Sequence, residues 1–181
     1  MRLFVGLDLP EEIVDHLADL IEKLKPSARI AWSTAANLHI TTKFIGWWPD
    51  ERLDEVKDAL AALPRRAVIP VHIRGLGFFP NARSPRVFWC GIEAPGLEAL
   101  AAETDRATAA LGIESEKRGF SPHLTLARIK EPINLRPLHD AIAGLPSTDF
   151  GQTKARRFFL YQSQLSPKGS VYTKLAEYPF A

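Results

Sequence analysis

The feature that most constrains the fold of this chain is an internal repeat with an offset of 84 residues. The segment around His39 reads Asn-Leu-His-Ile-Thr-Thr-Lys-Phe-Ile-Gly, and the segment around His123, which lies 84 residues later, reads Ser-Pro-His-Leu-Thr-Leu-Ala-Arg. The same offset relates an expected helix start at 11 to one at 95, and an expected strand at 68–78 to one at 152–162. Such a period indicates two copies of one supersecondary unit.

Each copy is expected to contain a strand, a helix, a short strand, the His-Thr strand, a second helix and a long strand. Apolar residues at helical spacing predict four helices, which begin near Pro10, Pro49, Pro95 and Asn134. Apolar runs between turn residues predict the strands, at 2–8, 29–32, 37–46, 67–78, 86–92, 121–128, 153–165 and 170–177.

Two copies are too few for a solenoid, so the predicted fold is α+β. We expect a bilobal, pseudo-symmetric duplication in which two antiparallel sheets line a central groove and helices cover their outer faces. Residues 1–181 are expected to form a single two-lobed domain, because no flexible linker or low-complexity tract interrupts them. The pattern leaves the strand order open, and a strand of one copy can complete the sheet of the other.

The composition is that of an ordinary globular protein. The 181 residues are 46% hydrophobic and 24% charged, and the formal net charge of +2 permits an anionic substrate without requiring one. The single cysteine, Cys90, excludes an intrachain disulfide and a Cys-based zinc site, and its apolar neighbours predict a buried strand residue. The first apolar run stops at Asp8, too early for a signal or membrane segment. We therefore expect a cytoplasmic protein, and we expect a monomer.

In both repeated segments a histidine and a threonine lie two residues apart on a predicted strand. His39 and Thr41 therefore share one face, and His123 and Thr125 share another. Two histidines can act as base and acid in one step near neutral pH. With threonine hydroxyls to hold the non-bridging oxygens, the set fits an in-line displacement at phosphorus that requires no metal.

Other uses of these residues carry less weight. One His-x-Thr segment alone is a weak signal, since a single histidine on a strand is more often structural, but the second copy favours a functional pair. Zinc is the competing use of two histidines. Neither segment supplies a carboxylate or a third histidine at ligand spacing, so we expect no metal site. His16, His72 and His139 are expected to be structural or solvent-facing.

Two basic residues follow the histidines and are possible nucleotide-binding residues. Lys43 lies four residues after His39 and is expected on the same face, although a solvated surface lysine is an equal alternative. Arg128 lies five residues after His123, so it reaches the groove only if the strand ends or bulges there. Aromatic residues that are candidates for stacking on a base are Trp47, Trp48, Phe79, Phe120 and Tyr161.

The two His-x-Thr segments resemble the signature motifs of the two-histidine phosphoesterase superfamily. Within it, the chain is most similar to the RNA 2',3'-cyclic phosphodiesterase family, also called the 2'-5' RNA ligase family. The similarity spans nearly the whole chain, including the first residues, Arg-Leu-Phe-Val-Gly-Leu-Asp-Leu-Pro after Met1, and residues 160–172. It implies the bilobal α+β fold and hydrolysis of a terminal 2',3'-cyclic phosphate to a 2'-phosphomonoester, without metal or cofactor. It also implies reversible joining of RNA ends through a 2'-5' bond.

The resemblance also implies roles for individual residues. His39 and His123 become the catalytic acid-base pair, Thr41 and Thr125 bind the substrate phosphate, and Arg128 matches an arginine that follows the second motif. We assign His39 as the acid that protonates the 3'-oxygen and His123 as the base that activates water, although the near-symmetry of the repeat allows the reverse.

The resemblance has one departure and leaves two alternatives. Thr42 stands where the family usually has an apolar residue, and it is expected to face the core and to need a hydrogen-bond partner. The expected partners are RNA ends or nucleotides with a 2',3'-cyclic phosphate, and no membrane. The alternatives are a noncatalytic RNA-binding module and the same chemistry on a small cyclic-phosphate nucleotide.

Overall fold

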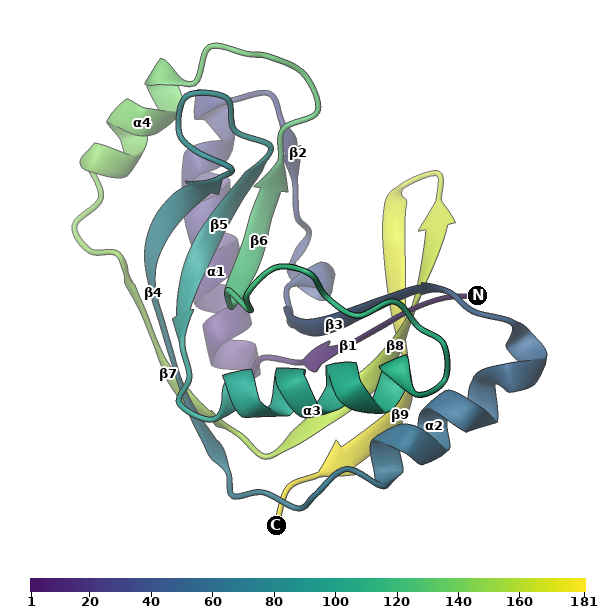
Figure 1. Cartoon of the computed structure of the whole chain (residues 1–181). Coiled ribbons are helices and arrows are strands. Elements are labelled where there is room, and N and C mark those ends of the chain that lie inside the picture. Colours follow the sequence, from purple (N-terminus) through teal and green to yellow (C-terminus); the bar gives the residue numbers. More distant parts are fainter.

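The computed structural model, which describes all residues 1–181, contains two antiparallel sheets (Figure 1). Sheet A has the strand order β3-β1-β8-β9 and consists of β1 (Arg2–Leu7), β3 (Ile40–Trp47), β8 (Arg157–Ser166) and β9 (Gly169–Pro179). Sheet B has the order β2-β6-β5-β4-β7 and consists of β2 (Ala31–Trp32), β4 (Ile69–Phe79), β5 (Val87–Glu93), β6 (His123–Arg128) and β7 (Asp149–Ala155). The predicted α+β fold with two antiparallel sheets is confirmed.

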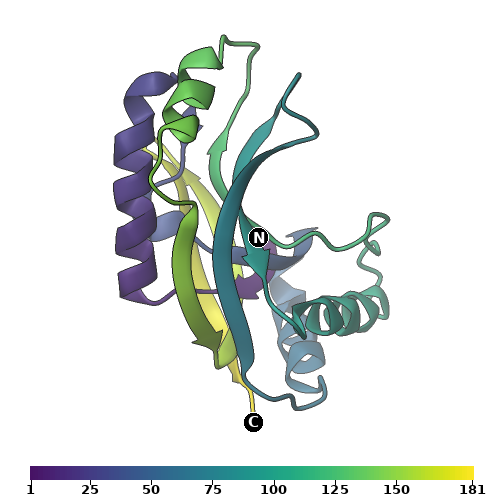
Figure 2. The same cartoon turned by 90° about the vertical axis from the view of Figure 1, so that its left-hand side faces the viewer.

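Four helices and three short 3-10 turns connect the strands. They are α1 (Glu11–Leu24), η1 (Lys25–Ser27), η2 (Ala35–Asn37), η3 (Asp50–Arg52), α2 (Leu53–Ala61), α3 (Leu97–Ala109) and α4 (Arg136–Ala143). Helices α1 and α4 cover sheet B, whereas α2 and α3 cover sheet A, so the sheets lie between the two helix pairs (Figure 2). The apolar stripe of each helix faces its sheet, as the burial of Ile13, Leu17 and Leu24 in α1 illustrates. No helix is long and apolar enough to cross a membrane.

The two halves of the sequence exchange strands. β4 belongs to the first half, but its two partners, β5 and β7, come from the second half. β8 belongs to the second half, but it pairs with β1 at the centre of sheet A. This exchange decides the strand order that the repeat alone left open. A hydrophobic core of 33 buried residues includes side chains of both sheets, among them Val5 and Ile73.

One predicted strand, 153–165, is wrong in its bounds because two strands occupy this region. β7 already begins at Asp149 and pairs with β4 at the edge of sheet B, and β8 begins at Arg157 and pairs with β1 in sheet A. Arg156 is the single residue between them. No glycine or proline marks this crossing between sheets, so the local pattern reads as one strand.

Candidate functional site

His39 lies immediately before β3, and both nitrogens of its ring are hydrogen-bonded. Nδ1 is 2.7 Å from the carbonyl oxygen of Asn37, and Nε2 is 2.8 Å from Oγ1 of Thr41. A carbonyl oxygen can only accept, so Nδ1 carries a hydrogen and donates it. In the neutral ring Nε2 then holds the lone pair and accepts the hydroxyl hydrogen of Thr41. In this tautomer Nε2 is therefore the ring nitrogen of His39 that holds the lone pair.

His123, the first residue of β6, is held in the same way. Its Nδ1 lies 2.9 Å from the carbonyl oxygen of Ser121, two residues earlier in the chain, as Asn37 is for His39. The same donor argument places the hydrogen on Nδ1 and, in the neutral ring, the lone pair on Nε2. Thr125 lies two residues further along β6. The duplicated sequence therefore produces a duplicated hydrogen bond that orients each imidazole.

The strands that begin at the two histidines meet. β3, which starts just after His39, and β6, which starts at His123, are in contact although they belong to different sheets. Burial lowers the pKa of His39, the hydrogen bond to the Asn37 carbonyl partly offsets this, and the charges of Arg128 and His123 lower the pKa further. Arg128 and His123 are thus the two charged groups that act on the His39 ring.

A β-bulge follows each His-x-Thr segment. Two residues of β3, Thr41 and Lys43, pair with the consecutive residues Gly6 and Val5 of β1, which leaves Thr42 as the extra residue. In β6, Leu126 is the extra residue in the pairing with β5. A bulge reverses the alternation of side chains beyond it.

The bulge in β3 overturns the expected position of Lys43. Instead of facing the groove, this side chain is only 4% exposed, and its Nζ donates hydrogen bonds to Asp105 Oδ1 at 2.6 Å and to the Glu114 carbonyl at 2.7 Å. Lys43 therefore joins β3 to α3 and to the loop that follows it, and it is not available to a nucleotide. Thr42 is buried as expected, and its hydroxyl finds a partner in the Val5 carbonyl at 3.1 Å.

The bulge in β6 has the opposite consequence for Arg128. Ala127 is buried and Arg128 is exposed, so Arg128 returns to the face of His123 and Thr125. Its positive charge is one of the causes that lower the pKa of His39. The position equivalent to Arg128 in the first half is occupied by Phe44, which is 57% exposed. The same backbone irregularity thus places an arginine on one side of the site and an aromatic ring on the other.

Aromatic rings surround His39 on sheet A. Its ring centroid lies 4.8 Å from that of Phe4, 6.1 Å from that of Tyr161 and 5.1 Å from that of Tyr172. Phe4 and Tyr161 are buried and stack on each other with a centroid distance of 4.8 Å. These rings restrict the orientation of the imidazole and remove water from one side of it, which explains why burial is the main cause of its lowered pKa.

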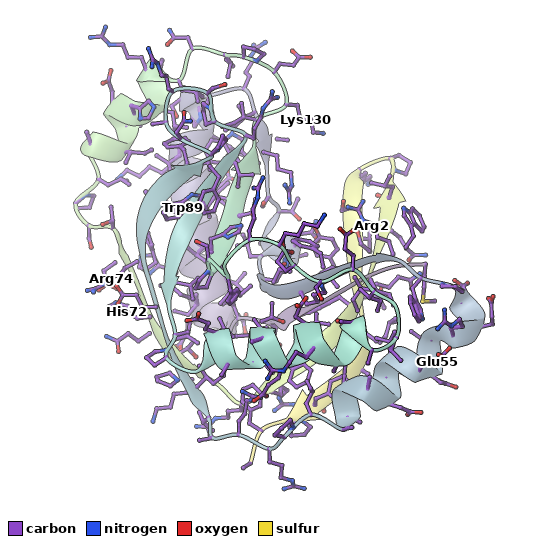
Figure 3. All side chains as sticks on the ribbon, viewed as in Figure 1. Arg2, Glu55, His72, Arg74, Trp89 and Lys130 are labelled. Carbon is purple, nitrogen blue, oxygen red and sulfur yellow. The ribbon has the colours of Figure 1, made fainter.

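Sheet B supplies a smaller aromatic wall beside His123. Phe79 meets the imidazole edge-on with a centroid distance of 5.0 Å, and Phe79 in turn contacts Trp89 at 5.2 Å. The Trp89 indole, on β5 (Figure 3), covers Gly77, where an added Cβ would lie 2.2 Å from a ring carbon. Its Nε1 is buried without a hydrogen-bond partner.

The remaining histidines lie outside this site. His16 contacts Phe150, and His139 contacts Phe78, each through an aromatic packing interaction. His72 pairs with Asp149 at 2.9 Å on β4, towards the β7 edge of sheet B (Figure 3). All three thus have packing or hydrogen-bond partners of their own.

The five aromatic residues proposed for stacking on a base differ in burial and in their distance from the histidines. Trp48 is buried and Phe120 is partly buried, whereas Trp47 is 80% exposed. Phe79 and Tyr161 lie beside the two histidines, as described above. The sequence reasoning missed Phe44 and Tyr172. The alternation from His39 assigns Phe44 to the wrong face, because only the pairing with β1 reveals the bulge.

Comparisons with known proteins identify the family to which this chain is similar. The sequence matches the LigT-like phosphoesterase family over residues 7–89 and 92–172. The RNA 2',3'-cyclic phosphodiesterase of Methanocaldococcus jannaschii is 35% identical over 179 residues, which are 98% of this chain and 100% of that protein. The crystal structure of TT0787 of Thermus thermophilus superposes with a TM-score of 0.83 at 32% identity, covering 99% of this chain and 98% of that one. The crystal structure of E. coli LigT complexed with 3'-AMP gives a TM-score of 0.81 at 27% identity and covers 99% and 97%.

Proposed function

The chain belongs to the LigT-like phosphoesterase family, and we propose that it is an RNA 2',3'-cyclic phosphodiesterase that opens the cyclic ester to a 2'-phosphomonoester. The observation that carries the proposal is the pair of imidazoles, each anchored through Nδ1 to a backbone carbonyl and each presenting Nε2. The names of relatives similar over nearly the whole chain support the substrate, an RNA end. The 3'-AMP bound by E. coli LigT supports a nucleotide in this fold.

The proposed reaction uses the two histidines on opposite sides of one phosphorus atom. His123 Nε2 accepts a proton from water, and the water oxygen forms a bond to phosphorus. The bond from phosphorus to the 3'-oxygen breaks, and His39 Nε2 donates its proton to that oxygen. The products are a 2'-phosphomonoester and a free 3'-hydroxyl, with one proton moved from His39 to the substrate and one from water to His123.

The threonines and Arg128 have electrostatic roles in this proposal. The hydroxyls of Thr41 and Thr125 donate to non-bridging oxygens of the phosphorane, whose charge grows in the transition state. Thr41 bonds His39 in the free protein, so the arrival of the phosphate exchanges this partner for a phosphate oxygen. Arg128 supplies positive charge on the same face. When a 5'-hydroxyl takes the place of water, the same groups can join it to the cyclic end: the 5'-oxygen bonds to phosphorus and gives its proton to His123, the bond from phosphorus to the 3'-oxygen breaks, His39 protonates that oxygen, and a 2'-5' linkage results.

Activity measurements on 2',3'-cyclic UMP in excess EDTA test this function. We expect turnover in the chelator, and we expect His39→Ala and His123→Ala each to lower kcat by about 10²- to 10⁴-fold, the usual contribution of a general acid or base. His16→Ala, which alters an exposed histidine on α1, is the matched control and should keep full activity.

Three outcomes would contradict the proposal. Undiminished turnover by both variants would contradict the two-histidine mechanism. Loss of activity in EDTA would contradict the claim that the reaction needs no metal. Binding of cyclic-phosphate RNA without any product would instead indicate a noncatalytic RNA-binding protein.

A further inference from the structure

An exposed tryptophan lies on sheet A beyond the two histidines. Trp47 is the last residue of β3 and is 80% exposed, although tryptophan is usually well buried. Trp48, the next residue, is buried and donates its indole hydrogen to the Arg52 carbonyl at 2.8 Å. Of the two adjacent indoles, one is thus buried in the protein and the other is exposed to solvent.

The strand pairing places Trp47 on the same face of sheet A as His39. Trp47 lies opposite Arg2, and Phe44 lies opposite Phe4, because a second bulge in β3 leaves Ile45 as an extra residue between them. Residues opposite one another on antiparallel strands share a face. Arg2 and Phe4 alternate with the buried Leu3, so they share the face on which Phe4 contacts His39. Trp47 and Arg2 therefore continue the surface that surrounds His39.

Arg2 adds a free positive charge to this surface. It is exposed and makes no ion pair, unlike Arg52, Arg66 or Arg157. Figure 3 shows Arg2 on the side of β1 and β3 that faces away from α2 and α3, near the β8–β9 hairpin. Tyr172 lies on the same face of sheet A, because Ser163 pairs with both Arg2 and Tyr172. We call Trp47, Arg2, Ser163 and Tyr172, which follow one another across the four strands, a row. The row thus holds two aromatic rings and a cation.

This row lies one step from the site along the strands. Arg2 and Phe4 are two residues apart, a separation of about 7 Å. Tyr172 also contacts both His39 and Phe4, at 5.1 Å and 5.0 Å between ring centroids. An aromatic surface with an adjoining unpaired cation is the chemistry that binds single-stranded nucleic acid, with rings for the bases and the charge for the backbone. It is continuous with the place where the terminal phosphate is proposed to react.

We propose that Trp47 and Arg2 form a subsite for the nucleotide that precedes the cyclic-phosphate end of a single-stranded RNA. The inference rests on the proposed function and goes beyond it, because it assigns residues of this chain to the nucleotide upstream of the reacting one. Trp47 stacks on the base and Arg2 pairs with the adjoining backbone phosphate. The energy of this contact is realised only when the substrate has a nucleotide upstream of the reacting one.

The test compares kcat/KM for a short oligouridylate ending in a 2',3'-cyclic phosphate with kcat/KM for 2',3'-cyclic UMP. We expect the native protein to prefer the oligonucleotide, and Trp47→Ala to reduce this preference by about 5- to 150-fold, the range for loss of one base-stacking contact. Trp47→Phe keeps a ring and should retain most of the preference. Arg2→Gln should reduce the salt slope for the oligonucleotide by about one.

A matched control uses Val171→Ala. Val171 is 48% exposed and precedes Tyr172 on β9, so it faces the other side of sheet A and its loss should leave the preference unchanged. Binding of the product, an oligouridylate ending in a 2'-phosphate, is measured in parallel by fluorescence anisotropy. We expect Trp47→Ala to weaken this binding, which reports on the subsite independently of turnover.

Different results would contradict the proposed function and the proposed subsite. No turnover of either substrate by the native protein would contradict the proposed function. Turnover of both with equal kcat/KM, unchanged in Trp47→Ala, would overturn the subsite alone. Sedimentation that shows a dimer in the native protein and a monomer in Trp47→Ala would also overturn it, because the exposed indole would then serve contact between two copies of the chain.

Discussion

His39 experiences two opposing influences on its affinity for a proton. Burial against Phe4 and Tyr161 lowers its pKa, while the hydrogen bond to the Asn37 carbonyl favours the charged ring. The charge of Arg128 acts in the same direction as burial. A bound phosphate brings negative charge and reverses this balance, so substrate binding itself should promote the protonated form that donates to the 3'-oxygen.

An NMR titration of the His39 ring proton tests this account. We expect a midpoint below 6.5 in the free protein, and we expect Arg128→Gln to raise it, because a nearby positive charge is removed. Saturation with inorganic phosphate should raise it as well. Arg83→Gln in the β4–β5 turn is the control. A His39 midpoint that does not respond to Arg128→Gln would contradict the proximity of the two side chains.

The same shift predicts a pH dependence of stability. The unfolded chain protonates His39 near pH 6.5, whereas the folded protein does so only at lower pH. The folded state therefore binds fewer protons between these two values. The contribution of a neutral His39 to the free energy of unfolding is present above pH 6.5 and is lost as the pH falls through the folded pKa.

The strands around the site contain β-bulges and a glycine that determine where their side chains lie. The bulges in β3 and β6 give each strand two consecutive inward-facing residues, Thr42 and Lys43 in one and Leu126 and Ala127 in the other. In β4, Gly77 leaves the space into which the Trp89 indole fits. The aromatic wall beside His123 thus depends on a missing side chain on the neighbouring strand.

Gly77→Ala should therefore destabilise the protein. An added Cβ would lie 2.2 Å from the Trp89 ring, so the indole or the strand must move, and overpacking of this kind costs about 1–3 kcal/mol. Gly119→Ala is the matched control, since nothing lies within 4 Å of its added Cβ. Urea denaturation gives the free energy of unfolding of both variants. Equal stability of the two would show that Trp89 does not occupy the space above Gly77.

At the scale of the whole molecule, neither half of the sequence can build a sheet alone. The first half holds β1 and β3 but must borrow β8 for the centre of sheet A, and its own β4 pairs only with strands of the second half. Helix α1, from the first half, covers sheet B, and α3, from the second half, covers sheet A. The repeat therefore describes two copies in the sequence but not two independent folding units.

A chain cut in the exposed turn between β4 and β5 tests this exchange. Residues 1–83 alone should be unfolded, because a two-stranded pair of β1 and β3 with an unpaired β4 cannot bury enough apolar surface. Mixing them with residues 84–181 should restore native circular dichroism and activity. A cooperative thermal transition of residues 1–83 alone would contradict the prediction and would indicate two autonomous domains.

The sequence by itself determined the features that depend on neighbouring residues. Helical and strand periodicities, proline and glycine boundaries and the two His-x-Thr segments are all local, so the element types, the fold class and the candidate pair His39 and His123 could be predicted. Only the tertiary structure decided the exchange of β4 and β8, the division between β7 and β8 and the two bulges that bury Lys43 and expose Arg128. Each of these depends on which distant strand supplies the hydrogen bonds. The alternation of side chains along a strand does not identify the strand with which it pairs.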